Sequence, residues 1–508
     1  MCAVVMLAAA CGNSPSDDGA APTAAPDTAT AAASEADTPD EAPEPETQPV
    51  LTDDAAEPET QPAEAGEAPE PDLEAEPEQA EQPATTEPEE SLVEEPVDPY
   101  PHRHDFVTLE GVPGVTDDEI RVNVIGTRAN NPLGTCILDC FVTGIQSYFD
   151  YVNDSGGVYG RQLMIGEILD DELFANKDRA LKVIADNNTL ASFQATLIAQ
   201  GWEDLHNAGV PTFVWNIDGT QSVNRENIFS NFVLGCITCT SRGLPWLVAQ
   251  AGGTRVASLG YGASANSKVC ARAFADSIDL YSADLGIEMA YFNDNLAFGL
   301  PNGIGPEVTQ MIDAGVDFIV NCLELNAMLT LAQELERQGA RDQIKMLHPN
   351  SYNAEFVADA GSLFDGDYVL VLFAAFEYGV ESDLLDAYRQ WVPASGGPVA
   401  EQTMVGWLNA DLFVTGLLEA GSEFDRNSIV DSLNQTTYGA DGLINPIDWR
   451  RQHWAVTEGE PLNDYELECV SYVRMEDGGF VGFQPEPWMC WPNDHLDWTE
   501  PTPTSFSA

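Results

Sequence analysis

Basic side chains are scarce in this sequence of 508 residues, where 20 Lys and Arg stand against 84 Asp and Glu and the formal net charge is −64. Residues 1–100 contain 27 acidic residues and no Lys or Arg, and the rest of the chain still carries a charge of −37. A field of this sign repels phosphate backbones and anionic lipid. The composition therefore argues against nucleic acid as a partner and against docking onto a membrane through a basic face.

Long apolar runs and catalytic signatures are also missing. The best internal apolar run, Tyr368–Phe376, is well short of the roughly 18 residues that a membrane-spanning helix needs. The sequence has no GxxxxGK[ST], no HExxH, no GxGxxG after a strand and no EF-hand loop. Residues 262–266 (GASAN) fall one Gly short of a nucleophile elbow, and a ligand-facing loop explains them better. We therefore predict a protein that is not an enzyme and uses no cofactor.

The N-terminus has small residues in front of a cysteine. Ala8, Ala9 and Ala10 end an apolar stretch that begins at Val4, and Cys11 follows them. This order resembles a bacterial lipobox, which implies that residues 1–11 are a lipoprotein signal and that Cys11 carries the lipid. No Lys or Arg precedes the apolar stretch, as a signal requires, so we expect the coding start to lie slightly upstream. The alternative is a disordered apolar N-terminus.

Residues 12–104 are rich in Pro, Ala and acidic residues, and Pro occurs 16 times in the first hundred residues. Such a segment buries too little apolar surface to offset its chain entropy, so we predict a disordered linker. Proline and like-charge repulsion keep a linker of this kind extended. Behind a lipid-anchored cysteine it would be a spacer between a membrane and a folded body. The alternative is a tail without a mechanical role.

From Val115 onward, apolar strands alternate with amphipathic helices. The alternation restarts after about residue 250, which predicts two parallel sheets, each covered by helices on both faces. The first expected unit has strands over 120–126, 163–169, 190–195 and 210–215, with helices over 136–153, 175–187 and 201–208. The second has strands over 255–261, 287–292, 317–322 and 344–347, with helices over 267–285, 306–314 and 327–338.

Several short motifs occur in an order that resembles one family. They are GVTDDEI at 114–120, FDYVN at 149–153 with GGVYGR at 156–161, the pair Asp170-Asp171, AGVP at 208–211, and AG at 420–421 followed by DRNSIV at 425–430. From these motifs the chain is identified as a member of the type I periplasmic solute-binding proteins of ABC transporters. The subgroup is the one named for leucine, isoleucine and valine binding, and the likeness covers about 115–485.

The resemblance implies two doubly wound Rossmann-like α/β lobes joined by three hinge crossovers. Lobe one is expected over 115–238 and 374–452, lobe two over 241–371 and 455–490, and a C-terminal tail over 491–508. It also implies the function, which is to capture a small solute between the lobes, close, and deliver it to a membrane permease. We expect a monomer at the extracytoplasmic face of the membrane. The alternative is a ligand-sensing receptor with the same fold.

Eight cysteines lie in the body of the chain, and an even number in an exported protein favours disulfides. Eight cysteines allow 105 connectivities, of which we favour Cys136–Cys140, Cys236–Cys239, Cys270–Cys322 and Cys469–Cys490. The alternative for the first two pairs is a zinc ion held by four thiolates. The pairs are 96 residues apart, and Cys236–Cys239 falls where the first hinge is expected, so we predict no metal site.

The resemblance places the solute between six strand-to-helix loops. Two family features are weakened here: the Ser-rich loop is ATLIAQ at 195–200, and Asn350 stands where amino-acid binders have the acid that receives the ammonium. Asp218 or Glu324 is expected to supply that anion, and Trp215 and Tyr352 either stack on the solute or pack in the lobe wall. The expected ligand-binding residues are Thr127, Thr196, Trp215, Asn216, Asp218, Ser264, Glu324, Asn350 and Tyr352. An amino acid, an amide or a related compound is the expected solute, and the alternatives are a polyamine-like cation and an aromatic compound.

Overall fold

The computed structural model describes residues 103–131, 136–215, 217, 219–231, 240–262, 265–349, 351–453, 467–492 and 497–506. The predicted signal, Cys11 and nearly all of the predicted linker lie outside these residues. None of the helices in the described part is long and apolar enough to cross a membrane.

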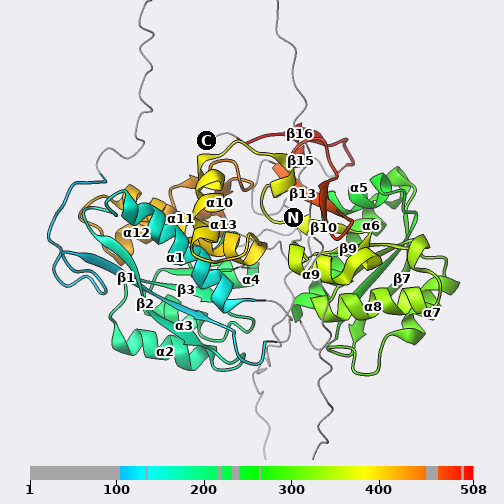
Figure 1. Cartoon of the computed structure of the whole chain (residues 1–508), viewed down its shortest axis with the longest axis horizontal. Helices are drawn as coiled ribbons and strands as arrows, with labels where there is room; N and C mark the ends of the chain where they lie inside the picture. Colours follow the sequence, from blue (N-terminus) through cyan, green and yellow to red (C-terminus); the bar gives the residue numbers. More distant parts are fainter. Residues whose placement is uncertain are drawn as a thin grey trace, which may run out of the picture. The chain divides into compact units, whose positions relative to one another are not determined.

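The first lobe is built on a five-stranded parallel sheet in the order β2-β1-β3-β4-β5 (Figure 1). Its strands are β1 (Glu119–Gly126), β2 (Gln162–Asp170), β3 (Ala191–Ala195), β4 (Thr212–Val214) and β5 (Ile228–Phe229). The helices between them are α1 (Leu138–Asp154), α2 (Asn176–Asp186), α3 (Trp202–Asn207) and α4 (Gly219–Ser222). β1 is buried over almost its whole length because both faces of a parallel sheet are covered.

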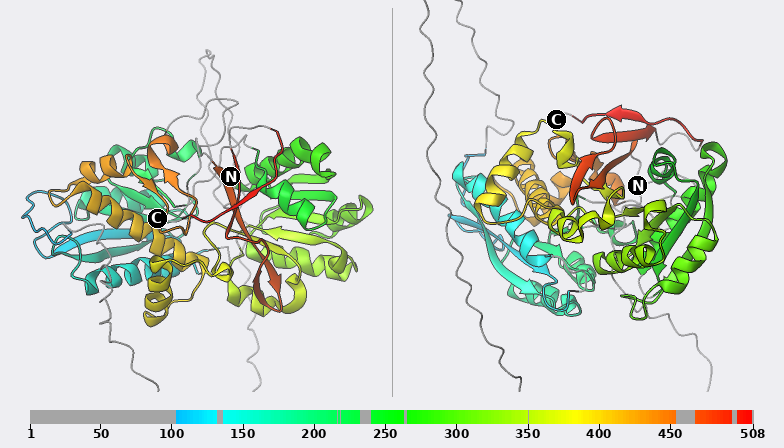
Figure 2. Two further views of the ribbon diagram at one scale, coloured as in Figure 1. Left: turned by 90° about the horizontal axis from the view of Figure 1, so that it is seen from above. Right: turned by 45° about the vertical axis from the view of Figure 1, so that its right-hand side comes forward.

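The chain returns to this lobe after the second sheet has begun. The returning elements are α10 (Asp383–Ala394), α11 (Glu401–Ala420), α12 (Arg426–Leu433), the short strands β11 (Thr437–Tyr438) and β12 (Ile447–Asp448), and α13 (Trp449–Gln452). In both views of Figure 2 the yellow and orange helices lie beside the cyan elements of the first sheet, far from them in sequence. Lobe one is therefore discontinuous in the chain.

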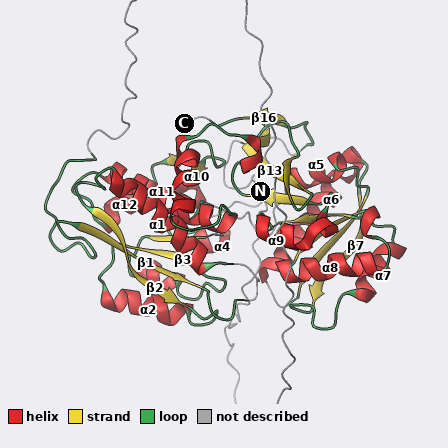
Figure 3. Ribbon diagram, viewed as in Figure 1, coloured by secondary structure: helices red, strands yellow, loops and turns green. Residues whose placement is uncertain are grey.

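The second lobe has parallel strands in the order β7-β6-β8-β9-β10, the same winding as the first lobe, and antiparallel strands beyond β10. The parallel strands are β6 (Arg255–Tyr261), β7 (Glu288–Leu296), β8 (Phe318–Cys322), β9 (Lys345–His348) and β10 (Tyr368–Val371). The helices are α5 (Gly243–Gln250), α6 (Ala265–Leu285), α7 (Gly305–Asp313), α8 (Leu325–Arg337) and α9 (Ala354–Ala360). Figure 3 shows helices on both sides of the strands in each lobe, as predicted for a doubly wound fold.

The C-terminal segment differs from the tail expected over 491–508. β13 (Leu467–Glu476) pairs with β10, with β14 (Gly479–Gly482) and with β15 (Trp488–Pro492), and β16 (Thr502–Thr504) pairs with β15. The apolar pattern after Cys490 is short and rich in Pro, so it gave no strand signal in the sequence. Backbone pairing with β15 makes 502–504 an edge strand of the second sheet, where Pro503 is tolerated.

Helices α1 and α11 cross at two glycines. A Cβ at Gly144 would collide with the carbonyl oxygen of Thr403, and a Cβ at Gly406 would collide with that of Phe141. The two helix backbones can approach this closely only because neither position carries a side chain. This contact fixes the returning helix α11, and therefore its first turn, against lobe one.

Residues of the GGVYGR motif at 156–161 have identifiable structural roles. Gly156 and Gly157 adopt positive φ values of 98° and 74° just after α1, which ends at Asp154, one residue beyond the predicted end. Arg161 is fully buried and donates hydrogen bonds of 2.6 Å to the carbonyl oxygens of Thr116 and Val107. The guanidinium thereby ties the segment before β1 to the turn before β2.

Three of the four predicted disulfides are confirmed. Cys136–Cys140, Cys270–Cys322 and Cys469–Cys490 are bonded, with Cα–Cα distances of 5.6, 6.1 and 4.1 Å. Cys469 and Cys490 are paired residues on β13 and β15, so this bond joins the antiparallel strands. Cys236 and Cys239 lie outside the described residues.

Candidate functional site

Three loops of lobe one meet on one buried carboxyl group. Asp171, directly after β2, accepts a 2.8 Å hydrogen bond from the hydroxyl of Thr127, which follows β1. The hydroxyl of Thr196, which follows β3, donates to the other oxygen of Asp171, and the backbone N–H of Leu173 also donates at 2.9 Å. Burial raises the pKa of Asp171, and these three donors oppose that rise. The structure thus brings together the two predicted hydroxyls and the second member of the Asp170-Asp171 pair.

This arrangement changes what the two hydroxyls offer to a solute. Each donates its proton to Asp171, and the Thr127 oxygen also accepts a 3.2 Å hydrogen bond from the N–H of Leu197. A hydroxyl has one proton to donate, so neither Thr has a second one for a solute carboxylate. The sequence interpretation of Thr196 as the retained hydroxyl of a carboxylate-binding loop did not include this internal acceptor.

In lobe two, Glu324 lies at the start of α8 and is 5 % exposed. One of its carboxylate oxygens accepts the hydroxyl of Tyr261, the last residue of β6. Tyr261 is fully buried, and burial together with this neighbouring carboxylate raises the pKa of its phenol. Glu324 is therefore at a strand end, as predicted, but it already has a hydrogen-bond donor inside the protein.

Tyr352, in the loop between β9 and α9, is 3 % exposed and packs against other aromatic rings. Its ring centroid lies 4.8 Å from that of Phe480 and 5.5 Å from that of Phe376. Its hydroxyl donates a 2.7 Å hydrogen bond to Glu377 and accepts one of 2.9 Å from the N–H of Phe376. Of the two roles left open by the sequence, these contacts correspond to packing in the lobe wall.

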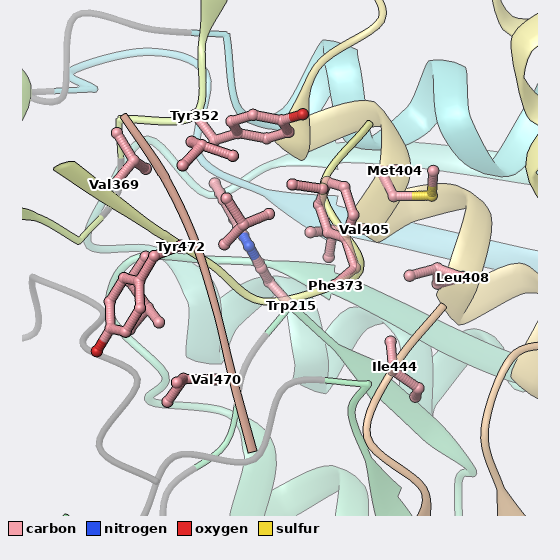
Figure 4. Packing of buried hydrophobic residues seen from close by; sticks show 14 of the residues in the cluster. Trp215, Tyr352, Val369, Phe373, Met404, Val405, Leu408, Ile444, Val470 and Tyr472 are labelled. Atoms are coloured by element: carbon pink, nitrogen blue, oxygen red, sulfur yellow. The ribbon is translucent and has the colours of Figure 1, made fainter. Parts of the chain in front are cut away.

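Trp215 follows β4 and is 8 % exposed. In Figure 4 its indole lies in an apolar cluster with Tyr352, Phe373 and Val405. The indole nitrogen Nε1 is buried and has no hydrogen-bond partner. An N–H in that condition has lost its water without replacement, which costs about 1–3 kcal/mol, and a solute acceptor would relieve the cost.

Glu401 was not predicted. It is the first residue of α11, is 2 % exposed, and its Oε2 is buried without a hydrogen-bond partner. Burial raises the pKa of this carboxyl group to about 8. An acidic residue at the start of a helix is a common sequence pattern because it faces the positive end of the helix dipole. The sequence alone therefore gave no signal that distinguished Glu401 from an ordinary solvated first-turn acid.

The other predicted site residues lie outside the described residues. They are Asn216, Asp218, Ser264 and Asn350. Their roles stay predictions.

The cysteines next to the first site loop are not available to a metal. Cys136 and Cys140 are bonded to each other, so this pair cannot provide the two thiolates that the zinc alternative requires. Within the described ranges, no group of three or more His, Cys, Asp or Glu residues has a geometry that could hold a metal ion.

Comparisons with known proteins identify the fold. A family model described as Periplasmic binding protein matches residues 136–459. A search of curated proteins finds no match. A solved solute-binding protein of an ABC transporter from R. palustris, in complex with 4-hydroxybenzoate, is 16% identical with a TM-score of 0.56, and covers 75% of this chain and 98% of its own.

Two further solved structures have a similar sequence identity, TM-score and coverage. The branched-chain amino acid transporter substrate-binding protein of Streptococcus pneumoniae, in complex with isoleucine, is 14% identical with a TM-score of 0.55, and covers 72% of this chain and 100% of its own. A fatty acid ABC transporter substrate-binding protein from Thermomonospora curvata is 15% identical with a TM-score of 0.52, and covers 79% and 97%. Since the family model matches more than half of the chain, and the two-lobed α/β fold agrees with it, the protein belongs to the type I periplasmic binding proteins of ABC transporters.

Proposed function

We propose that this protein is the extracytoplasmic substrate-binding component of an ABC importer. It captures one small solute between its two lobes, closes about the segments that connect them, and hands the solute to a membrane permease. Family membership over residues 136–459 supports this function. The structural observation that carries it is a pair of buried polar groups without a hydrogen-bond partner, Nε1 of Trp215 and Oε2 of Glu401. The backbone N–H of Glu401 is bonded to Tyr352 of lobe two.

The segment that leads from the second sheet back to lobe one, residues 372–382, contacts elements of both lobes. It leaves β10 of the second sheet and enters α10 of lobe one. Phe376 packs on Tyr352 from lobe two at 5.5 Å and on Tyr388 from α10 at 5.7 Å, measured between ring centroids. A few residues in such a position absorb the dihedral changes of a hinge closure. We propose that residues 372–382 are one of the three hinge crossovers.

The proposed solute is an amino acid, an amide or a related compound. The predicted loop residues are its first expected contacts, with the correction that Thr127, Thr196 and Glu324 already have partners within the protein. Structural relatives have been crystallised with isoleucine and with 4-hydroxybenzoate, so both amino acids and aromatic acids belong in a first screen.

Cys11 is proposed to carry the lipid anchor, and residues 12–104 to space the folded body from the membrane. The acidic linker, with its many prolines, would keep the body away from an anionic surface. A Cys11→Ala variant is expected to leave the membrane fraction and appear in the soluble exported fraction. Membrane retention of the variant would contradict the anchor.

The function is tested by a thermal-shift screen of the purified protein followed by uptake. The screen covers amino acids, amides, polyamines, aromatic acids and fatty acids, and a solute at 100 times its Kd should add about 2.7 kcal/mol of stability. Cells lacking the gene should then lose high-affinity uptake of the solute that gives the shift. Unchanged uptake by those cells would contradict import, and a change in gene expression without a change in uptake would indicate a sensor.

A further inference from the structure

We infer that Glu401, at the first turn of α11, receives the amino group of the solute, and that capture of the amine releases a proton from this carboxyl group. The inference rests on the proposed function and adds a substrate class and a specificity-determining residue. The observations that carry it are the isolation of Glu401, its hydrogen bond to lobe two, and a second unpartnered group, on Trp215, in the apolar cluster that contains Val405 of the same helix as Glu401.

Glu401 is isolated within the described part of the chain. Its side chain is 2 % exposed, its Oε2 has no hydrogen-bond partner, and no cation or donor contributes to its environment. The other buried or half-buried carboxyl groups near the strand ends have donors: Asp171 has two hydroxyls and an N–H, and Glu324 has Tyr261. A buried carboxyl group without a partner is costly, and native proteins keep such groups where function needs them.

Glu401 lies at a contact between the two lobes. Its backbone N–H donates a 3.5 Å hydrogen bond to the carbonyl oxygen of Tyr352, in the loop after β9. Residues three and four positions further along a helix share its face, and for Glu401 these are Met404 and Val405. In Figure 4 Val405 lies in the cluster that contains Trp215, Phe373 and Tyr352. Glu401 therefore lies one helical turn from Val405, a residue of the apolar cluster that also contains Trp215 and its unpartnered indole N–H.

These groups fit an amine with an apolar body. A carboxylate oxygen accepts hydrogen bonds from an ammonium group in a short, charge-assisted contact. The indole of Trp215, in an apolar cluster, suits an apolar chain or ring, and its N–H suits an acceptor on the solute. A purely anionic solute has fewer hydrogen-bond donors available, because Thr127 and Thr196 donate to Asp171. The charge of −37 on the body also repels an anion.

The proton balance follows from burial. Free Glu401 holds its proton at neutral pH, because burial raises its pKa to about 8. The amine enters as an ammonium ion, and the complex contains a carboxylate and an ammonium, so the carboxyl proton leaves to solvent. Affinity for the amine should then rise about tenfold for each pH unit between 6 and 7.

Among the residues that the structure describes, the other titratable groups beside this turn of α11 do not reproduce this pattern. Tyr388 donates to Ala400 and contacts Thr403, and Tyr352 donates to Glu377. Burial raises the pKa of both phenols, so they stay protonated between pH 6 and 8. Desolvation raises the pKa of Glu377 as well, but Glu377 already accepts the Tyr352 hydroxyl.

The test is calorimetric titration of the full chain with matched probes. Phenethylamine, L-phenylalanine and L-leucine carry an amino group, and 3-phenylpropionate and 4-methylpentanoate have the same apolar bodies without it. We expect at least one amine probe to bind and the two acids not to bind. Repeating the titration in buffers of different ionisation enthalpy should show close to one proton released per amine bound at pH 6–7.

Glu401→Gln should weaken amine binding by roughly 30-fold or more and remove both the proton release and the pH dependence. Glu307→Gln, in the first turn of α7, is the matched control and should bind as wild type does. Amine binding without proton release, or with unchanged affinity in Glu401→Gln, would overturn the inference. Binding of an acid probe and of no amine would overturn the inference while the proposed function stands. Failure of every amine probe would also overturn it, and the broad solute screen would then decide the function separately.

Discussion

The hydroxyl of Thr127 donates a 2.8 Å hydrogen bond to Asp171, which joins the loop after β1 to the loop after β2. Thr196 brings the loop after β3 to the same carboxyl group. Two of the loops that were expected to face a solute are thus held by one internal acceptor, in the loop after β2, before any solute arrives. Preformed loops of this kind lower the ordering cost of binding.

Removing one of these hydroxyls should lower stability. Thr127→Val keeps the shape of the side chain but leaves Asp171 with one donor fewer in a buried environment, so we expect a loss of about 1–3 kcal/mol in the free energy of unfolding. Urea denaturation followed by tryptophan fluorescence measures it. Thr309→Val, which removes an exposed hydroxyl on α7, is the control. Equal midpoints for the two variants would show that the Asp171 cluster contributes nothing to stability.

Glu401 should make the stability of the protein depend on pH. Its folded pKa of about 8 is above its ordinary value of 4.5, so the folded state holds the proton more tightly than the unfolded state. The wild type should therefore lose stability as pH rises from 4.5 to 8, by up to about 5 kcal/mol, with no further contribution outside that window.

The measurement compares wild type with Glu401→Gln by urea denaturation at pH 5 and at pH 9. The neutral amide cannot ionise, so the variant should gain on the wild type as pH rises. A difference between the two proteins that is the same at both pH values would mean that Glu401 is solvated in the folded state. This stability experiment needs no solute and is independent of the amine titration.

The crossing of α1 and α11 should not tolerate a methyl group. Gly406→Ala would push its Cβ into the carbonyl oxygen of Phe141, and overpacking of this kind typically costs about 1–3 kcal/mol. Gly166→Ala on β2 meets only ordinary contacts, the nearest at 3.5 Å, and serves as the control. Thermal unfolding of both variants should show a lower Tm for Gly406→Ala alone.

The disulfide between β13 and β15 should stabilise the protein more than the one next to α1. Cys469 and Cys490 are 21 positions apart in sequence, whereas Cys136 and Cys140 are 4 apart. In the chain-entropy model the longer loop is worth about 3 kcal/mol, and the shorter loop less. Unfolding of the two paired Cys→Ser variants measures the difference. A larger loss from the Cys136/Cys140 pair would contradict that ranking.

Much of the fold was predictable because its signals are local. The strand expected over 255–261 is β6 to the residue, and the helix expected over 306–314 is displaced by one residue from α7. Apolar periodicity and glycine stops act within a few residues, so a sequence reveals them. The strand at 502–504 was missed because its only support is pairing with β15, which no local pattern encodes.

The site was predicted less completely, for a physical reason. Sequence order placed Thr127, Thr196 and Glu324 at strand ends. It could not show that Thr127 and Thr196 would donate to Asp171, or that Glu324 would accept from Tyr261. Glu401 was missed altogether because burial of a first-turn acid depends on how α11 packs against Tyr352 and Trp215. Donor and acceptor pairing is decided by tertiary contacts, and a residue pattern does not contain them.

We propose above all that this protein binds one small solute and closes on it. Calorimetric titration with the compound that gives the largest thermal shift, combined with small-angle X-ray scattering of the same samples, tests it most directly. We expect a stoichiometry of one solute per chain and a smaller radius of gyration of the folded body at saturation. Binding that leaves the scattering curve unchanged, or no saturable binding by any compound of the screen, would contradict it.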